Sequence, residues 1–197
     1  MRRLNDCLTS EQISQDIYVE SPLVHPSVTF CKNIVQELGG YRDGPFPEDY
    51  DLWLRLHHAG HRMDKLPQTL LYWRAHPGSL SRTCSRYSRE AFDKLRALYM
   101  ASDPLLLKNR DHFVIWGAGR MTRRRTTHLQ QQGFTPCAWI DIDPKKIGSI
   151  PVHPPKWLET NKPFVLVYVA NHGAQELISN DLIRMGYQKG TDFFLVG

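Results

Sequence analysis

The sequence predicts an α/β protein with two parts, an irregular, mainly helical unit followed by a small domain built on a parallel sheet. Three observations support this. After residue 111, short apolar runs alternate with helical patterns, which is the order of βαβ units. The first run, Phe113 to Trp116, is apolar throughout and ends at Gly117, as expected for a strand buried on both faces. The length of 197 residues allows one or two domains.

For the first part of the chain, the sequence predicts short helices joined by loops. A helix is expected over Lys32–Leu38, where two glycines end it, and another begins at Glu48 after a loop rich in glycine and proline. The helix predicted over Ser88–Met100 stops before Pro104, because a proline disfavours the helical conformation in the residue before it. We therefore expect residues 1–104 to form one unit.

For residues 111–197, the sequence pattern predicts a Rossmann-like domain with a parallel sheet of four strands. The expected strands are Phe113–Trp116, Cys137–Asp141, Phe164–Ala170 and Phe193–Val196. The expected helices are Met121–Gln132 and Ala174–Met185. The proline-rich stretch between the second and third strands predicts no regular element.

Composition and charge exclude several classes of protein. Hydrophobic residues make up 41% and charged residues 23%, which is typical of globular domains. The longest apolar run has seven residues, whereas a membrane helix needs ~20, so we expect no transmembrane segment. Four cysteines without a CxxC pair indicate reduced thiols and a cytoplasmic protein. The net charge of +5 owes much to four arginines, but no nucleic-acid motif accompanies them, so we expect no nucleic-acid partner. These are Arg120, Arg123, Arg124 and Arg125.

The helix that begins at Glu48 has a dense set of acidic groups. Glu48, Asp49 and Asp51 stand in its first turn, where the helix dipole favours negative charge. At about 100° per residue, Asp49 falls on the side of Trp53 and the core, while Asp51 points away from the core. Either these acids only complement the dipole, or they have a functional role.

Several blocks of residues follow one another between residues 21 and 82. The blocks are Ser21–Phe30, Leu38–Arg42, Glu48–Leu56, Leu66–His76 and Ser79–Ser81. In this order they resemble the acceptor-side half of the bacterial family 2 inverting glycosyltransferases of the A-type fold. The resemblance implies transfer of a sugar from a nucleotide sugar to a saccharide acceptor, in polysaccharide or glycoconjugate synthesis.

The resemblance also implies roles for single residues. Asp49 matches the catalytic base, which takes the proton of the acceptor hydroxyl, and Glu48 is its partner in the Glu-Asp pair of the family. His25 and Trp53 are implied to lie at the substrate site, or His25 has a capping or core role. His76 matches a histidine near the metal-bound diphosphate, or it is a surface residue before a Pro-Gly turn.

One part of the family pattern is missing. The family holds its nucleotide with an N-terminal half that ends in an Asp-x-Asp motif, whereas 20 residues precede Ser21 here. We therefore expect a truncated gene product, a fragment or a split subunit that is inactive alone. A divalent metal, Mg²⁺ or Mn²⁺, is expected only with the missing donor half, which could be a separate partner.

The second domain contains a possible phosphate-binding turn. Gly117 to Gly119 forms a Gly-x-Gly turn between a strand and a helix, although Thr122 replaces the third glycine of the fingerprint. The domain resembles the Rossmann-like domain appended to some bacterial family 2 glycosyltransferases. This implies a structural or interaction role, or else nucleotide binding. The candidate nucleotide-binding residues are Gly117, Gly119, Arg120 and Asp141.

Overall fold

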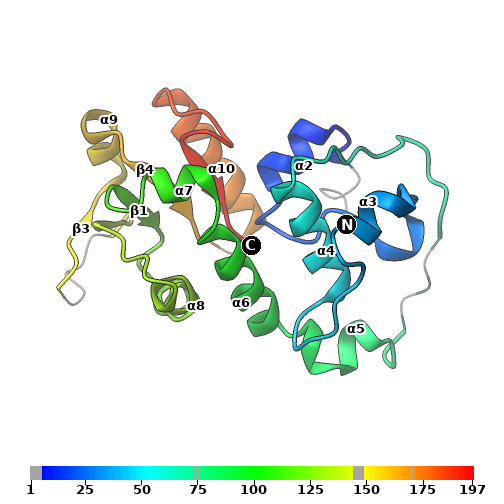
Figure 1. Ribbon diagram of the computed structural model, residues 1–197. Helices are drawn as coiled ribbons and strands as arrows, with labels where there is room; N and C mark the ends of the chain where they lie inside the picture. Colours follow the sequence, from blue (N-terminus) through cyan, green and yellow to red (C-terminus); the bar gives the residue numbers. More distant parts are fainter. Residues whose placement is uncertain (1–5, 73, 75, 144–148, 170) are drawn as a thin grey trace. The chain divides into compact units, whose positions relative to one another are not determined.

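The computed structural model describes residues 6–72, 74, 76–143, 149–169 and 171–197 (Figure 1). The chain divides into two compact units, unit 1 (residues 1–96) and unit 2 (residues 97–197), and the division falls within helix α6 (Arg89–Met100). The assignment of domains to residues 1–104 and 111–197 stays a prediction. No helix among the described residues combines the length and the apolar character that a membrane span requires.

Unit 1 is built from helices and loops in the part that the structure describes. In chain order the elements are α2 (Ser10–Asp16), η1 (His25–Ser27), α3 (Lys32–Glu37), α4 (Glu48–His58), α5 (Leu80–Thr83), η2 (Ser85–Tyr87) and the first part of α6. The predicted helix over Lys32–Leu38 and the predicted helix start at Glu48 are confirmed. Of the quoted sequence blocks, Trp73 and Ala75 lie outside the described residues.

Helix α2 begins with a capping box. The hydroxyl of Thr9 accepts a hydrogen bond from the backbone N–H of Gln12, and the Gln12 side chain accepts one from the N–H of Thr9. The segment after α4 binds the same end of the helix. The N–H of Ser10 donates to Asp64 (2.8 Å), and the N–H of Met63 donates to the Ser10 hydroxyl (3.3 Å). These bonds fix the start of α2 against the chain that leaves α4.

Helix α4 is buried along most of its length. Tyr50, Leu52, Trp53 and Leu54 all belong to the core of the unit. The phenol of Tyr50 donates a 2.5 Å hydrogen bond to the backbone oxygen of Ile17, at the end of α2. The start of α4 is therefore held at a defined place in unit 1.

The prediction that Asp51 points away from the core is wrong. Asp51 is 3% exposed, and its carboxylate accepts a 2.9 Å hydrogen bond from Nε of Arg55. The Arg55 guanidinium also donates to the backbone oxygens of Leu38 (2.8 Å) and Gly40 (2.7 Å), which follow α3. The helical-wheel argument assumed one apolar face and one wet face. It failed because the end of α3 covers the second face and a buried ion pair fills it.

Unit 2 contains a parallel sheet of five strands in the order β3-β2-β1-β4-β5. The strands are β1 (Phe113–Trp116), β2 (Ala138–Ile140), β3 (Val152–His153), β4 (Phe164–Val167) and β5 (Phe193–Leu195). The helices of this unit after α6 are α7 (Pro104–Lys108), α8 (Arg120–Gln131), η3 (Pro155–Trp157), α9 (Leu158–Asn161) and α10 (His172–Arg184). The predicted α/β class and the parallel sheet are confirmed.

The sheet has one strand more than predicted. Strand β3 has two residues, and they pair with Trp139 and Ile140 of β2. Two residues are too few to produce a periodic signal, and the neighbouring prolines favour a loop. The four predicted strands are present with shorter ends. Ala170, the predicted end of the third, lies outside the described residues.

The order of the strands reverses between β1 and β4. The chain runs outward from β1 through β2 to β3, returns to β4 beside β1, and continues to β5. The carboxyl ends of β1 and β4 therefore form the topological switch point, where open parallel sheets commonly bind ligands. Gly117 and Tyr168 are the first residues after these two ends.

Candidate functional site

Asp49 lies in the first turn of α4, half-buried. Its carboxylate accepts a 2.7 Å hydrogen bond from the backbone N–H of Tyr50. Burial raises the pKa of Asp49 above its ordinary value, and the nearby carboxylate of Glu48 raises it further. The N–H of Tyr50 and the charge of His25 oppose this rise in pKa. The side chain is thus a carboxylate with increased proton affinity at a partly exposed helix start.

Glu48 is held by hydrogen bonds that Asp49 does not have. The phenol of Tyr87 lies 2.8 Å from both carboxylate oxygens of Glu48 and donates to them. The guanidinium of Arg86 lies 3.7 Å from Glu48 and 2.7 Å from Asp43. Burial raises the pKa of Tyr87, and its hydrogen bond to Glu48 adds to this. The two neighbouring acids therefore have different environments, since Glu48 is fixed by side chains of η2.

Aromatic rings surround the same helix start. The ring of His25, in η1, lies 5.0 Å from the ring of Tyr41 and 6.5 Å from the ring of Trp53. Trp53 is 1% exposed, and its Nε1 has no hydrogen-bond partner among the described residues. His25 also acts electrostatically on Asp49. The structure thus brings together four of the residues singled out in the sequence. They are His25, Glu48, Asp49 and Trp53.

His76 is not joined to this group by any contact among the described residues. It lies exposed in the turn before α5, where its backbone oxygen accepts hydrogen bonds from the N–H and the hydroxyl of Ser79. Its proposed place near a metal-bound diphosphate stays a prediction. Among the described residues, no three His, Cys, Asp or Glu side chains are arranged to hold a metal ion.

Sequence reasoning missed three residues of this group. Tyr41 was quoted only as part of a block, and the tertiary structure places it against His25. Tyr87 and Arg86 lie outside every quoted block, and 39 residues separate Tyr87 from Glu48. No local pattern marks them, because their contact with Glu48 exists only in the folded chain.

In unit 2, the Gly-x-Gly turn is already bound by a side chain. The N–H of Ala118 donates a 2.8 Å hydrogen bond to the carboxylate of Asp141, which follows β2. Gly117 has φ of 110°, and a Cβ there would lie 3.1 Å from Oγ1 of Thr122. Thr122 therefore lies close to Gly117. A nucleotide-binding role for Gly117, Gly119, Arg120 and Asp141 stays a prediction.

The arginines of α8 do not form one group. Arg120, Arg123 and Arg124 are exposed, whereas Arg125 is 5% exposed. The guanidinium of Arg125 donates to the backbone oxygens of Tyr168 and Gly197 and lies 5.3 Å from the centre of the Tyr168 ring. Arg125 therefore binds backbone at the switch point, and its charge is not available at the surface.

Comparison with known proteins finds partial matches to glycosyltransferases. The amylovoran biosynthesis glycosyltransferase AmsE of Erwinia amylovora is 37% identical over 68 residues, which are 34% of this chain and 26% of that protein. The O-antigen biosynthesis glycosyltransferase WbnJ of Escherichia coli is 32% identical over 95 residues, 44% of this chain and 37% of that protein. An uncharacterized glycosyltransferase of Haemophilus influenzae is 35% identical over 74 residues, 38% and 27% of the two chains. No protein-family model matches the chain, and no solved structure matches it significantly.

The matched segments cover between 26% and 37% of the length of these relatives. All three relatives are named glycosyltransferases, and two are named for the biosynthesis of amylovoran and of O-antigen. These matches support a glycosyltransferase relationship for this chain.

Proposed function

We propose that unit 1 is the acceptor side of a family 2 inverting glycosyltransferase with the A-type fold. It would transfer a sugar from a nucleotide sugar to a saccharide acceptor in polysaccharide or glycoconjugate synthesis. The observation that carries the proposal is the environment of Asp49, a half-buried carboxylate of raised pKa beside His25 and Trp53. The names of the partial relatives support the same reaction class.

Asp49 acts as the general base in this proposal. The acceptor oxygen forms a bond to the anomeric carbon, the bond from that carbon to the diphosphate breaks, and Asp49 takes the proton of the acceptor hydroxyl. A general base is most effective when its pKa lies near the working pH, so a raised pKa suits this role. Glu48 is a positioning residue here, because Tyr87 and Arg86 already engage its carboxylate.

The donor nucleotide sugar is proposed to bind a donor half-domain, with a divalent Mg²⁺ or Mn²⁺ held there. The matched segments leave most of each relative's length outside the alignment, which is consistent with a donor part elsewhere. We propose that this chain alone does not transfer sugar. His76 is proposed to lie near the diphosphate once the donor half is present.

Transfer by a reconstituted enzyme tests the proposal. A donor half taken from one of the relatives would be supplied in cis or in trans, and turnover measured with nucleotide sugars and Mg²⁺ or Mn²⁺. Asp49→Asn is expected to reduce turnover by ~10²–10⁴-fold, because a positioned base contributes about that much. The amide can still accept the hydrogen bond from the N–H of Tyr50, so the fold is expected to persist.

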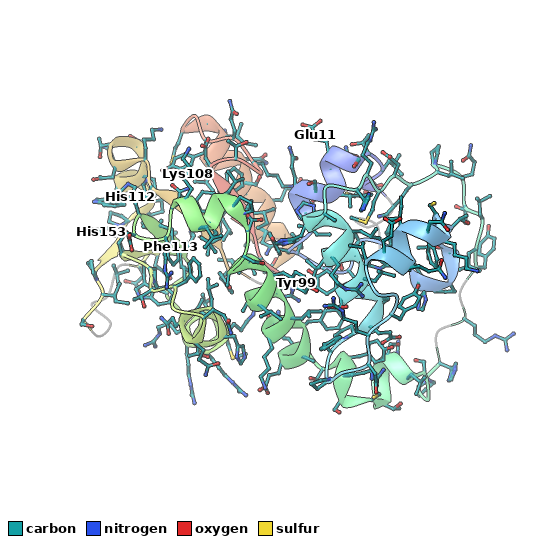
Figure 2. All side chains as sticks on the ribbon, in the orientation of Figure 1. Glu11, Tyr99, Lys108, His112, Phe113 and His153 are labelled. Carbon is teal, nitrogen blue, oxygen red and sulfur yellow. The ribbon has the colours of Figure 1, made fainter. Side chains whose placement is uncertain are left out.

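The control is Glu11→Gln, which removes an exposed acid from the first turn of α2 (Figure 2). An acid that serves only the helix dipole contributes about 0.3–1 kcal/mol, all of it to stability. Glu11→Gln should therefore leave turnover unchanged. If Asp49→Asn and Glu11→Gln reduce turnover equally and by less than about tenfold, Asp49 is not the base.

Unit 2 is proposed to be a Rossmann-like domain with a packing or interaction role. The observation that favours this role is the hydrogen bond from Ala118 to Asp141. A phosphate in the turn would have to displace Asp141 or lie beside its negative charge. At the same switch point, Thr122 lies close to Gly117 and the buried Arg125 donates to the backbone oxygen of Tyr168.

A further inference from the structure

Two exposed aromatic rings lie beside the candidate base. Phe30 is 42% exposed and Tyr41 is 40% exposed, and their ring centroids are 6.4 Å apart. The ring of Tyr41 also lies 5.0 Å from the ring of His25. Phe30 precedes α3 and Tyr41 follows it, so folding brings these rings together. We name Phe30, Tyr41 and His25 the aromatic shelf.

The aromatic shelf adjoins the carboxylates at the start of α4. Burial raises the pKa of the Tyr41 phenol, and the carboxylates of Asp49 and Glu48 raise it further, so the phenol is within electrostatic reach of both acids. Aromatic faces next to hydrogen-bonding groups suit a ligand with an apolar face and a polar edge. A sugar ring has this character, with C–H groups on its face and hydroxyl groups around its edge.

A buried hydrogen-bond donor without a partner in the described part of the chain belongs to the same group of rings. Nε1 of Trp53 is buried and has no acceptor among the described residues, whereas most buried polar atoms have a partner. The Trp53 ring lies 6.5 Å from the ring of His25. This observation is independent of the acidic residues and of the exposed rings.

The charges of the cluster favour an uncharged ligand. The charged groups joined by these contacts are the carboxylates of Asp43, Glu48 and Asp49 and the guanidinium of Arg86. Together these interacting groups carry a net negative charge. Asp49 and Glu48 act electrostatically on Tyr41 of the aromatic shelf, so they would repel a negatively charged sugar there.

We propose that the acceptor is an uncharged sugar whose ring lies on Phe30 and Tyr41, and that uronic acids are rejected. This inference rests on the proposed function, because it names the acceptor class for the same site. Asp49 receives the acceptor hydroxyl, the aromatic shelf carries the ring, and the net negative charge selects against carboxylated sugars.

Saturation-transfer NMR on the full chain tests the inference without any transfer reaction. The probes are the methyl glycosides of glucose, galactose and N-acetylglucosamine, compared with glucuronic and galacturonic acid. At least one neutral glycoside is expected to bind, and Tyr41→Ala is expected to weaken it by about tenfold, the effect of one lost stacking contact. Tyr72→Ala, which removes a tyrosine that is 90% exposed, should change nothing.

A second variant tests the charge argument. Asp43→Asn removes a carboxylate that is 91% exposed, so the fold is expected to tolerate it. Binding of the uronic acids should rise in Asp43→Asn at low salt, while binding of the neutral glycoside stays unchanged. Circular dichroism of Tyr41→Ala and Tyr41→Phe checks the fold, and Tyr41→Phe should keep most of the affinity, because it keeps the ring.

Several results would overturn the inference. They are no binding of any neutral glycoside, tighter binding of uronic acids, or equal affinity in the wild type and a folded Tyr41→Ala. The proposed function fails separately, if the reconstituted enzyme binds a neutral glycoside at Tyr41 and its turnover does not depend on Asp49. Conversely, turnover that depends on Asp49 together with a KM unaffected by Tyr41→Ala would refute the aromatic shelf alone.

Discussion

At the scale of single residues, Asp49 and Asp51 show how two neighbouring acids in one helix turn acquire different properties. Asp51 is buried and paired with Arg55 at 2.8 Å. Asp49 receives its 2.7 Å hydrogen bond from the backbone and has Glu48 nearby, and its pKa is raised. Removing one partner of a buried ion pair destabilises the fold, whereas a carboxylate of raised pKa is itself held at some cost to stability.

We predict that Asp49→Asn increases the stability of the folded chain at neutral pH. A carboxyl group whose pKa is higher in the folded than in the unfolded state binds protons more tightly when folded. Stability therefore falls as the pH rises from the ordinary pKa of 3.8 through the raised pKa of folded Asp49. Asn carries no charge and avoids this loss. Urea unfolding of the wild type and of Asp49→Asn from pH 3 to pH 8 measures the two stabilities.

The comparison is the difference in stability between Asp49→Asn and the wild type at each pH. This difference should grow in favour of Asp49→Asn as the pH rises and then level off above the folded pKa. Asp51→Asn should behave in the opposite way at neutral pH, because it leaves the buried guanidinium of Arg55 without its carboxylate. A difference that is constant across this range would show that the charge of Asp49 has no cost to the fold.

At the scale of elements, α4 is fixed by contacts with the ends of two helices that precede it, α2 and α3. Tyr50 reaches the end of α2 and Arg55 reaches the two carbonyl groups after α3. The Asp51–Arg55 pair spans one turn and is buried, whereas the Glu90–Lys94 pair of α6 has the same spacing and is exposed. Because the two pairs have the same helical spacing and differ in burial, comparing them shows how burial changes the contribution of an ion pair to stability.

We predict that Arg55→Met destabilises the chain by ~3–5 kcal/mol. Methionine fills a similar volume, but Asp51 would remain buried without its partner and two carbonyl groups would lose a donor. Lys94→Met, in the exposed pair, should cost at most about 0.5 kcal/mol. Denaturant unfolding measures both variants. Equal losses for the two variants would mean that Arg55 contributes no more than a surface ion pair.

At the scale of the whole molecule, the two units offer different possibilities for binding. Unit 1 places aromatic rings and carboxylates around the start of α4. Unit 2 has its switch point between β1 and β4, but Asp141, Thr122 and Arg125 already contact the groups that line it. We therefore propose that the ligand-binding site of this chain lies in unit 1.

Of the two roles that the sequence left open for unit 2, we choose packing over nucleotide binding and predict that the full chain does not bind free nucleotides. In unit 2 the carboxylate of Asp141 holds the N–H of Ala118 and repels a phosphate. Calorimetry with uridine and adenine nucleotides and Mg²⁺ should therefore give no binding heat up to millimolar concentrations.

Asp141→Asn is the matched control, because the amide oxygen can still accept from Ala118 while the charge is removed. Weak binding that appears only in Asp141→Asn would support the role of the charge. Binding to the wild type that is unchanged in Asp141→Asn would show that the turn accepts phosphate regardless of Asp141.

Local patterns in the sequence were sufficient for much of the fold. The alternation after residue 111 predicted four of the five strands of the parallel sheet, and the predicted helices after β1 and β4 are confirmed within a few residues. Residues close in sequence share one face or one turn, so a pattern reports them directly. The helix start with Glu48 and Asp49 was predicted for the same reason.

The tertiary structure decided which side chains meet. Asp51 is buried because residues after α3 cover it, and Arg125 is buried because it binds Gly197, 72 residues away. Glu48 is fixed by Tyr87, 39 residues away, and β3 forms because β2 provides an edge to pair with. Sequence periodicity describes one segment at a time. Burial and charge pairing depend on segments distant in the chain, and only folding brings these together.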